Sequence, residues 1–358
     1  MKRSLLPLFI LVLYCGSPAG ADPVADSFKK EFNQLHSDGI FNGNLLVAKN
    51  GKVLLLSSQG IADYRDGRKL NEQTVFNLAS VSKPFTATAI LLLIQKGKLS
   101  MDSPLAGLLP QFRAMPGKWQ DIQIKHLLSH TSGLPDYEEL ADDYFEESEQ
   151  ESPSKFINND QIISMLVDLK PELSFDPGTD YEYSNTGYLL LASVVEKASG
   201  QSFEAFLKSN IFAPAGMQST VLCTAERQIP NRAIGFGRSE DEPYLDDVEY
   251  LDGVYGDGNL CSNVTDLLKF DQAWRNGRVL NQEWSELAET PATLDDGTEL
   301  EYGMGWEVAD NLAYHTGSWT GFRTYFIRDR SEGYTIIVLD NSSNDELYDQ
   351  VDRLIEDL

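Results

Sequence analysis

The chain has 358 residues, of which 55 are acidic and 29 are basic, and its formal net charge at neutral pH is −26. This length allows a large core and is near the size at which one core divides in two. The excess of negative charge argues against nucleic acid or an anionic lipid surface as a partner, because both present phosphate groups. Charge by itself leaves the fold open.

The N-terminus has the pattern of an export signal. Lys2 and Arg3 precede an apolar run over residues 5–14, and Ala19-Gly20-Ala21 offers a small-residue cleavage site. The run is too short to span a bilayer, and no later segment reaches that length. We predict a signal peptide over residues 1–21, cleaved after Ala21, and a periplasmic or secreted protein with no transmembrane segment. An ordinary N-terminal helix is the alternative.

Two cysteines, Cys223 and Cys261, lie beyond this segment. Disulfides form in exported proteins, so a bridge between the two cysteines is possible. The sequence does not give the distance between them, so two separate buried thiols are an equally good interpretation.

Strand patterns occur near both ends of the chain. Residues 44–48 and 53–56 flank an Asn-Gly pair at positions 50 and 51, which predicts a hairpin. Further strands are expected at residues 304–308, 312–315, 322–328 and 334–339.

The middle of the chain is dominated by helical spacing. We expect helices over residues 22–37, 80–94, 124–128, 161–169, 185–198, 203–212, 267–274, 282–288 and 345–358. Residues 136–151 carry nine carboxylates and no basic residue, so this stretch is predicted to be a solvated surface loop.

This order of elements predicts an α/β (α+β) fold. An antiparallel sheet built from both chain ends is flanked by the N- and C-terminal helices, and a mainly helical domain is inserted between its two parts. We place the sheet domain at residues 22–78 and 295–358 and the inserted domain at residues 79–294. Together they form one catalytic unit.

Ser80 and Lys83 are the first candidates for catalysis. The S-x-x-K pattern occurs three times, beginning at Ser27, Ser80 and Ser152, but only Ser80 lies between an apolar segment and a helix opened by a proline. Residues three apart on a helix share a face, so the hydroxyl and the amine can act as nucleophile and base.

Other hydrolytic arrangements find little support. The G-x-S-x-G nucleophile elbow is absent from the sequence. His126 and His130 are four apart and could hold a metal, but no glutamate follows His126 and no third ligand is evident. We therefore expect a structural pair of histidines, no metal and no cofactor.

Three motifs in order carry a family resemblance. Ser80-Val81-Ser82-Lys83, Tyr183-Ser184-Asn185 and His315-Thr316-Gly317 resemble the motifs of the serine β-lactamase and D-Ala-D-Ala carboxypeptidase superfamily. The branch resembled holds class C β-lactamases, serine DD-carboxypeptidases and β-lactamase-like esterases. Residues 127–134, 175–178 and 256–260 also resemble this family, and its fold is the β-lactamase/transpeptidase fold.

The resemblance implies a role for each motif residue. Ser80 forms an acyl-enzyme, and Lys83 and Tyr183 share its proton, with a tyrosine phenolate stabilised by nearby positive charge. Asn185 binds the substrate amide and orients Lys83. The remaining binding and oxyanion residues are His315, Thr316, Gly317 and Ser318, with backbone N–H groups of Ser80 and Ser318 forming the oxyanion hole.

Three further residues are candidates for structural or binding roles. His130 is expected to brace the inserted domain, and Tyr181 lies near the motif without matching it. Arg323 either binds an anion in the cleft or lies on the surface at a strand edge.

The resemblance predicts an exported serine hydrolase acting on a D-Ala-D-Ala-like peptide, a β-lactam or a small ester or amide. β-Lactamases of this branch usually have lysine where this chain has His315, and histidine is only partly charged at neutral pH, which lowers the expectation of β-lactamase activity. The alternatives are a promiscuous carboxylesterase and a penicillin-recognising sensor that does not turn over. The substrate is a small molecule or peptide, and the oligomeric state stays open.

Overall fold

The computed structural model describes residues 22–147, 156–224, 227–238 and 242–356. The predicted signal peptide therefore lies outside the described residues. Within these ranges, no helix has both the length and the apolar character needed to cross a membrane.

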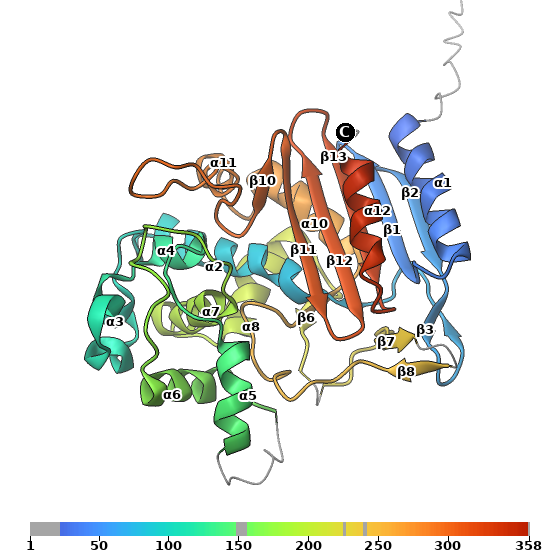
Figure 1. Ribbon diagram of the computed structural model, residues 1–358. Helices are drawn as coiled ribbons and strands as arrows, with labels where there is room; N and C mark the ends of the chain where they lie inside the picture. Colours follow the sequence, from blue (N-terminus) through green and yellow to red (C-terminus); the bar gives the residue numbers. More distant parts are fainter. Residues whose placement is uncertain (1–21, 148–155, 225–226, 239–241, 357–358) are drawn as a thin grey trace, which may run out of the picture.

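The main sheet has six antiparallel strands drawn from both ends of the chain (Figure 1). Its order is β10-β11-β12-β13-β1-β2, so strands from the two chain ends pair in mid-sheet, where β1 and β13 meet. The predicted fold class is thereby confirmed. The strands are β1 (Gly43–Lys49), β2 (Lys52–Gln59), β10 (Glu307–Ala309), β11 (Leu312–Trp319), β12 (Phe322–Asp329) and β13 (Tyr334–Asp340).

Glycine decides where two of these strands begin or end. Asn50 and Gly51 both have positive φ, 51° and 78°, which is the backbone of the tight turn predicted between β1 and β2. The strand expected from residue 304 starts only at Glu307. Gly305 has φ of 80° and lies so close to α2 (Lys83–Gln95) that an added Cβ would be 3.1 Å from the carbonyl oxygen of Lys83, so the backbone turns there.

Helices cover both faces of the sheet. On one face, α1 (Pro23–Ser37) and α12 (Glu346–Ile355) pack over a core that includes Phe28, Phe32 and Ile336 (Figure 1). On the other face, α10 (Val264–Arg275) contacts β13 and β1. Helix α2 is buried on all sides, as expected for a helix that is apolar all round.

The remaining helices lie between β2 and β10 in the chain, as the insertion predicts. They are α3 (Leu105–Leu108), α4 (Ile124–Leu128), α5 (Tyr137–Glu147), α6 (Asn159–Leu169), α7 (Asn185–Ser199), α8 (Phe203–Leu207), α9 (Ala213–Ala215) and α11 (Gln282–Ala288), with 3-10 turns at Ala79–Ser82, Pro110–Ala114 and Gly117–Asp121 and a π-helical turn at Lys208–Phe212. The exact domain boundaries at residues 79 and 294 stay a prediction, and α10 packs on the sheet although it falls within the predicted insertion.

Short strands connect the two parts. They are β3 (Ile61–Asp63) with β4 (Arg68–Lys69), β5 (Phe76–Asn77) with β9 (Leu260–Ser262) and β6 (Val221–Leu222), and β7 (Phe236–Arg238) with β8 (Pro243–Leu245). Beside this three-stranded sheet a disulfide joins Cys223 to Cys261, which decides between the two interpretations left open by the sequence.

Removing this disulfide should destabilise the protein. The bridge closes a loop over a sequence separation of 38 residues, so the double variant Cys223→Ser/Cys261→Ser is expected to lose about 3–4 kcal/mol of unfolding free energy. Urea unfolding measures the loss, and wild-type protein kept in reductant should match the variant. A midpoint that does not move under either treatment contradicts the expectation.

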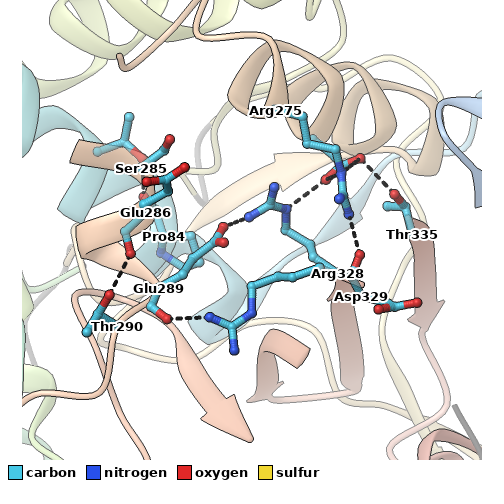
Figure 2. A network of polar contacts seen from close by, with 12 residues as sticks. Pro84, Arg275, Ser285, Glu286, Glu289, Thr290, Arg328, Asp329 and Thr335 are labelled. Atoms are coloured by element: carbon cyan, nitrogen blue, oxygen red, sulfur yellow. Dashed lines mark hydrogen bonds and ion pairs between the residues drawn. The ribbon is translucent and has the colours of Figure 1, made fainter. Parts of the chain in front are cut away.

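A buried polar network ties α10 to the sheet (Figure 2). Asp271 on α10 accepts hydrogen bonds from Nε of Arg328 (2.7 Å), Nε of Arg275 (2.9 Å) and Oγ1 of Thr335 (2.7 Å). Arg328 also forms an ion pair with Glu289. Strands β12 and β13 are thus fixed to the helix that lies behind them.

Candidate active site

A cleft of about 1390 Å³ lies beside β11 and is lined by residues of both predicted parts of the molecule. Seven of the eight predicted site residues line it, and the eighth, Lys83, lies fully buried beneath. The seven residues that line the cleft are Ser80, Tyr183, Asn185, His315, Thr316, Gly317 and Ser318.

Ser80 lies in a tight turn that precedes α2. The 3-10 turn Ala79–Ser82 begins with Ala79 at φ of 49°, and its N–H donates to the Asn77 side chain at 2.9 Å. Ser82 accepts the N–H of Leu260 at 3.0 Å, which fixes the turn to β9. The long helix predicted from residue 80 is therefore a 3-10 turn followed by α2, and the turn presents the Ser80 side chain to the cleft.

Lys83 is held under the serine by three acceptors. Its Nζ donates to Oγ of Ser80 at 3.0 Å, to Oδ1 of Asn185 at 2.7 Å and to the carbonyl oxygen of Asp257 at 2.9 Å. Burial lowers the pKa of Lys83 to about 8, although nearby carboxylates oppose the shift. About a tenth of the amine is therefore neutral at pH 7 and about half at pH 8. In the neutral form two N–H groups can still donate to Asn185 and Asp257, and the lone pair faces the Ser80 hydroxyl as a proton acceptor.

Tyr183 lies on the other side of the same amine. Lys83 Nζ is 4.7 Å from the centre of the Tyr183 ring, and the hydroxyl of Tyr183 bonds to Ser80. Although 37% of Tyr183 is exposed, burial around its hydroxyl raises its pKa well above the ordinary value. The phenolate predicted from the sequence is therefore disfavoured, and Tyr183 is placed as a neutral hydroxyl.

His130 supports Tyr183 from behind. The two rings stack with centroids 4.3 Å apart, and Nδ1 of His130 accepts the N–H of Ser184 at 3.1 Å. His130 is buried, and burial lowers its pKa well below the ordinary value, so the ring is neutral. Its position against Tyr183 fits the bracing role expected for it.

Gly317 lets β11 approach the nucleophile closely. A Cβ at this position would be 2.5 Å from the carbonyl oxygen of Leu78 and 3.0 Å from the backbone nitrogen of Ser80. Thr324 Oγ1 also donates to the carbonyl of Leu78 at 2.7 Å. Because a Cβ would clash here, only glycine lets β11 pass this close to the turn that carries Ser80. The oxyanion hole formed by the N–H groups of Ser80 and Ser318 stays a prediction.

His315 is neutral and already bonded. Its Nδ1 lies 2.6 Å from the carbonyl oxygen of Thr316, so Nδ1 carries the proton, and Nε2 accepts from the hydroxyl of Tyr302 at 3.1 Å. Burial lowers the pKa of His315 to about 3. The partly charged histidine expected from the sequence is therefore wrong, and this position offers a substrate no positive charge.

A carboxylate occupies the next position along the cleft. Oε1 of Glu307 lies 3.4 Å from the backbone nitrogen of Thr316 and 3.5 Å from its hydroxyl, and both groups donate to it. Burial raises the pKa of Glu307 above its ordinary value. The N–H and the hydroxyl of Thr316 are therefore already bonded to Glu307. An anionic substrate group placed at Thr316 would compete with this carboxyl group for both donors.

The acidic stretch also reaches the site, where sequence reasoning expected a solvated loop. Residues 137–147 form α5, and Tyr137 is buried. Asp136 accepts the N–H of Asn185 at 2.8 Å, at the N-terminus of α7, and Glu138 accepts the Asn185 amide at 3.1 Å. Burial and the neighbouring carboxylates raise the pKa of Glu138 to about 8. For residues 136–147 the surface-loop interpretation is wrong, because the start of this stretch packs against the cleft. Residues 148–151 of the predicted loop lie outside the described residues.

Asp257 is a further residue that sequence reasoning did not select. It is 5% exposed and accepts the hydroxyl of Tyr137 at 2.8 Å through Oδ2, while Oδ1 has no hydrogen-bond partner. Its backbone carbonyl accepts from Lys83. Residues 256–260 resemble the family in the sequence analysis, and this resemblance was the signal that could have identified Asp257 as a residue of the site.

Two other candidates lie apart from the reaction. Arg323 is 8% exposed, forms an ion pair with Asp345 and donates to the carbonyl of Thr320 at 2.8 Å, so it neither binds an anion in the cleft nor lies free on the surface. His126 accepts the N–H of Gln123 at 3.2 Å and caps α4. In the part of the chain that the structure describes, no group of three or more His, Cys, Asp or Glu side chains is placed to hold a metal.

The overall fold is shared with solved structures. A penicillin-binding protein from Bacillus halodurans superposes with a TM-score of 0.77 at 25% identity, over 91% of this chain and 98% of that one. A D-amino acid amidase from Ochrobactrum anthropi SV3 gives a TM-score of 0.76 at 25% identity, over 94% and 98% of the two chains. The fold is therefore that of the penicillin-binding proteins and their relatives.

Sequence comparison gives the family. The chain is 36% identical over 336 residues to penicillin-binding protein 4* of Bacillus subtilis (strain 168), which covers 89% of this chain and 72% of that protein. The model of the Beta-lactamase family matches residues 28–358, and the chain belongs to this family. The superfamily resemblance inferred from the three motifs is confirmed.

Proposed function

We propose that the protein is an exported serine hydrolase that forms an acyl-enzyme on Ser80, with Lys83 as the proton acceptor. The observation that carries this proposal is the 3.0 Å contact between Lys83 Nζ and Ser80 Oγ, made by an amine whose pKa is lowered to about 8. A neutral amine within hydrogen-bond reach of a hydroxyl in an open cleft is the arrangement that nucleophilic catalysis needs.

Acylation follows from the positions of these groups. Ser80 Oγ bonds to the substrate carbonyl carbon as its proton passes to Lys83, and the carbonyl electrons move to the oxygen, which the N–H groups of Ser80 and Ser318 stabilise. When the carbonyl re-forms, the bond to the leaving group breaks. The leaving group takes the proton from Lys83 through the hydroxyl of Tyr183. A water molecule then attacks the acyl carbonyl carbon as its proton passes to Lys83. The ester bond to Ser80 breaks, Ser80 Oγ takes the proton back from Lys83, and the acid is released.

The substrate proposed is a small ester, an amide or a D-Ala-D-Ala-like peptide, in preference to a β-lactam. Asn185 presents its side chain to the cleft and suits a substrate amide, and the related proteins include a penicillin-binding protein and a D-amino acid amidase. The neutral His315 and the adjacent Glu307 offer poor recognition of the carboxylate that every penicillin carries. A promiscuous esterase is the second candidate, since this cleft makes no demand for an anionic group. A sensor that acylates without turnover is the third.

Export rests on the N-terminal pattern and on the disulfide. The Cys223–Cys261 bridge supports residence in an oxidising compartment, because disulfides are rare where thiols are kept reduced. The proposal places the mature protein in the periplasm or outside the cell.

The experiment that tests the function combines a substrate panel with intact-mass analysis. The panel contains nitrocefin, an acyl-D-Ala-D-Ala peptide, an amino acid amide and p-nitrophenyl acetate, and penicillin is added separately to look for an adduct. Turnover of any member with a transient acyl mass, absent in Ser80→Ala, supports the hydrolase. A stable penicillin adduct without turnover supports the sensor. Turnover that survives in Ser80→Ala shows that the assignment is wrong.

The pH dependence of kcat/KM should follow the ionisation of Lys83. Only the neutral amine accepts a proton, so activity is expected to be low below pH 7, to rise through about 8, where the Lys83 pKa lies, and to level off above it. Glu138 also has a pKa near 8 and bonds to Asn185. Initial rates from pH 5.5 to 10, measured for wild type and Glu138→Gln, separate the two groups. A rise that persists in Glu138→Gln belongs to Lys83, and a profile without a rise in either protein contradicts the prediction.

A further inference from the structure

The cleft extends beyond the catalytic residues along β11. Its outer part is lined by Thr316, Tyr314 and Leu312 on that strand and by Tyr348 and Asp352 on α12. In the sheet, residues two apart on a strand face the same side, so these β11 side chains form one wall. The wall runs along the cleft away from Ser318, so it can contact the part of a substrate that extends beyond the reacting group.

The charged side chains that line the cleft all have acidic groups. Among the described residues that line the cleft there is no lysine or arginine, whereas seven carboxyl groups line it: Glu138, Asp257, Glu307, Asp310, Asp329, Asp352 and Glu356. None of the seven forms an ion pair with another described residue. The amine of Lys83 lies beneath the floor and is occupied by its three acceptors. Glu138, whose pKa is raised to about 8, is largely neutral at pH 7. The other carboxyl groups give the cleft negative charge that no described lysine or arginine pairs with.

An unmet acceptor lies in the same cleft. Asp257 is 5% exposed and lines the cavity, and its Oδ1 has no hydrogen-bond partner among the described residues. A buried carboxylate oxygen without a partner is costly, and a donor supplied by a ligand removes that cost. This orphaned oxygen points to a ligand with a donor group independently of the acidic wall.

The aromatic residues of the cleft suit the same kind of ligand. Tyr181, Tyr314, Trp319 and Tyr348 all line it. Ring faces attract ammonium groups by cation–π interaction, and combinations of aromatic and acidic residues bind substituted ammonium ions. Aromatic side chains alone would equally suit a neutral apolar group, so charge is the property that an experiment must vary.

We propose that the cleft selects substrates that carry a positively charged group, an amine or a quaternary ammonium, held by Glu307 beside the wall of β11. Thr316, which contacts Glu307, and Ser318, which supplies the oxyanion N–H, are two residues apart, so the charge lies about 7 Å from the scissile carbonyl. The proposal rests on the proposed hydrolase function and specifies its substrate class. The charge belongs either to the leaving group or to the acyl group, and the two are tested separately.

Two isosteric substrate pairs show whether the recognised charge belongs to the leaving group or to the acyl group. Acetylthiocholine and 3,3-dimethylbutyl thioacetate differ only in the charge of the leaving group. The p-nitrophenyl esters of 4-(trimethylammonio)butanoic acid and 5,5-dimethylhexanoic acid differ only in the charge of the acyl group. In at least one pair, wild-type kcat/KM is expected to favour the cation roughly fivefold to tenfold at low salt, and the preference should shrink as salt is added. Equal rates within both pairs overturn the proposal.

Variants locate the preference in the cleft. Glu307→Gln keeps an acceptor for Thr316 and removes the charge, so the ratio between cation and neutral substrate should fall to about one while the neutral substrate is still turned over. Glu283→Gln, on the exposed surface of α11 and outside the cleft, is the matched control and should keep the wild-type ratio. If Glu307→Gln leaves this ratio unchanged, or Glu283→Gln lowers it equally, the preference for the cation comes from the overall charge of the protein and the proposal is overturned.

A binding measurement separates this proposal from the hydrolase itself. In Ser80→Ala protein, calorimetry should give choline a dissociation constant roughly fivefold lower than that of 3,3-dimethylbutan-1-ol, and Glu307→Gln in the same background should abolish the difference. If no ester, amide or peptide of the substrate panel is turned over through Ser80 but choline is preferred, the hydrolase proposal fails and the cation site stands. If esters are turned over through Ser80 but neither measurement shows a cation preference, the cation site fails and the hydrolase stands.

Discussion

Lys83→Met should lower kcat/KM at least about 10³-fold for every substrate that the wild-type enzyme hydrolyses. Methionine has a similar length but cannot accept the proton of Ser80, and Tyr183 cannot replace the amine because burial raises its pKa well above the ordinary value. The loss should appear in acylation, so the rate at which a penicillin or a p-nitrophenyl ester labels Ser80 falls in proportion. Stopped-flow release of p-nitrophenol measures this step directly.

The matched control for this variant is Lys98→Met. Lys98 is exposed just beyond the C-terminus of α2, and its replacement should leave kcat/KM unchanged. Folding of Lys83→Met is checked by circular dichroism and thermal unfolding, since Asn185 and the carbonyl of Asp257 lose a donor. If folded Lys83→Met keeps its acylation rate within tenfold of wild type, another group is the base and the proposed mechanism is wrong.

The sequence could predict which candidate residues lie together because their positions depend on short-range rules. Ser80 and Lys83 are one helical turn apart. Asn185 is the first residue of α7, a helix that the apolar run following it in the sequence predicts. The structure brings these groups within hydrogen-bond distance in one cleft. The order of the three motifs in the sequence predicts that they meet, because proteins of one fold place motifs of that order in the same cleft.

The surroundings of these groups were harder to predict because burial is a property of the whole chain. The stretch that contains Asp136 and Glu138 has so many carboxylates that its composition indicated solvent, yet both side chains bond to Asn185. The charge of His315 was misjudged for the same reason, since a sequence does not show the burial that lowers its pKa to about 3. Titration states are set by desolvation, and desolvation is decided by residues far apart in the chain.

Asp271→Asn should destabilise the protein by up to about 3–5 kcal/mol, because it removes one of the two carboxylates that compensate the buried Arg328 and leaves only Glu289. Arg328 is 2% exposed and lies between Trp274 and Trp306, with its guanidinium carbon 5.4 Å and 5.3 Å from the two ring centres. Burial lowers the pKa of Arg328 only to about 10, so the side chain stays charged at neutral pH and Asp271 is needed to balance it. The change in unfolding free energy is measured by urea denaturation at pH 7.

A double-mutant cycle distinguishes the ion pair from general disruption of the core. Arg328→Met alone should also be destabilising, but Asp271→Asn combined with Arg328→Met should cost less than the sum of the two, because the second change no longer strands a charge. Asp143→Asn, on an exposed position of α5, is the surface control and should be within about 0.5 kcal/mol of wild type. Additive losses in the cycle, or an Asp271→Asn midpoint equal to that of wild type, show that the pair does not act as a unit. A coupled result means that α10, which packs behind β13 and β1, is fixed to β12 by an ion pair in addition to its packing against the sheet.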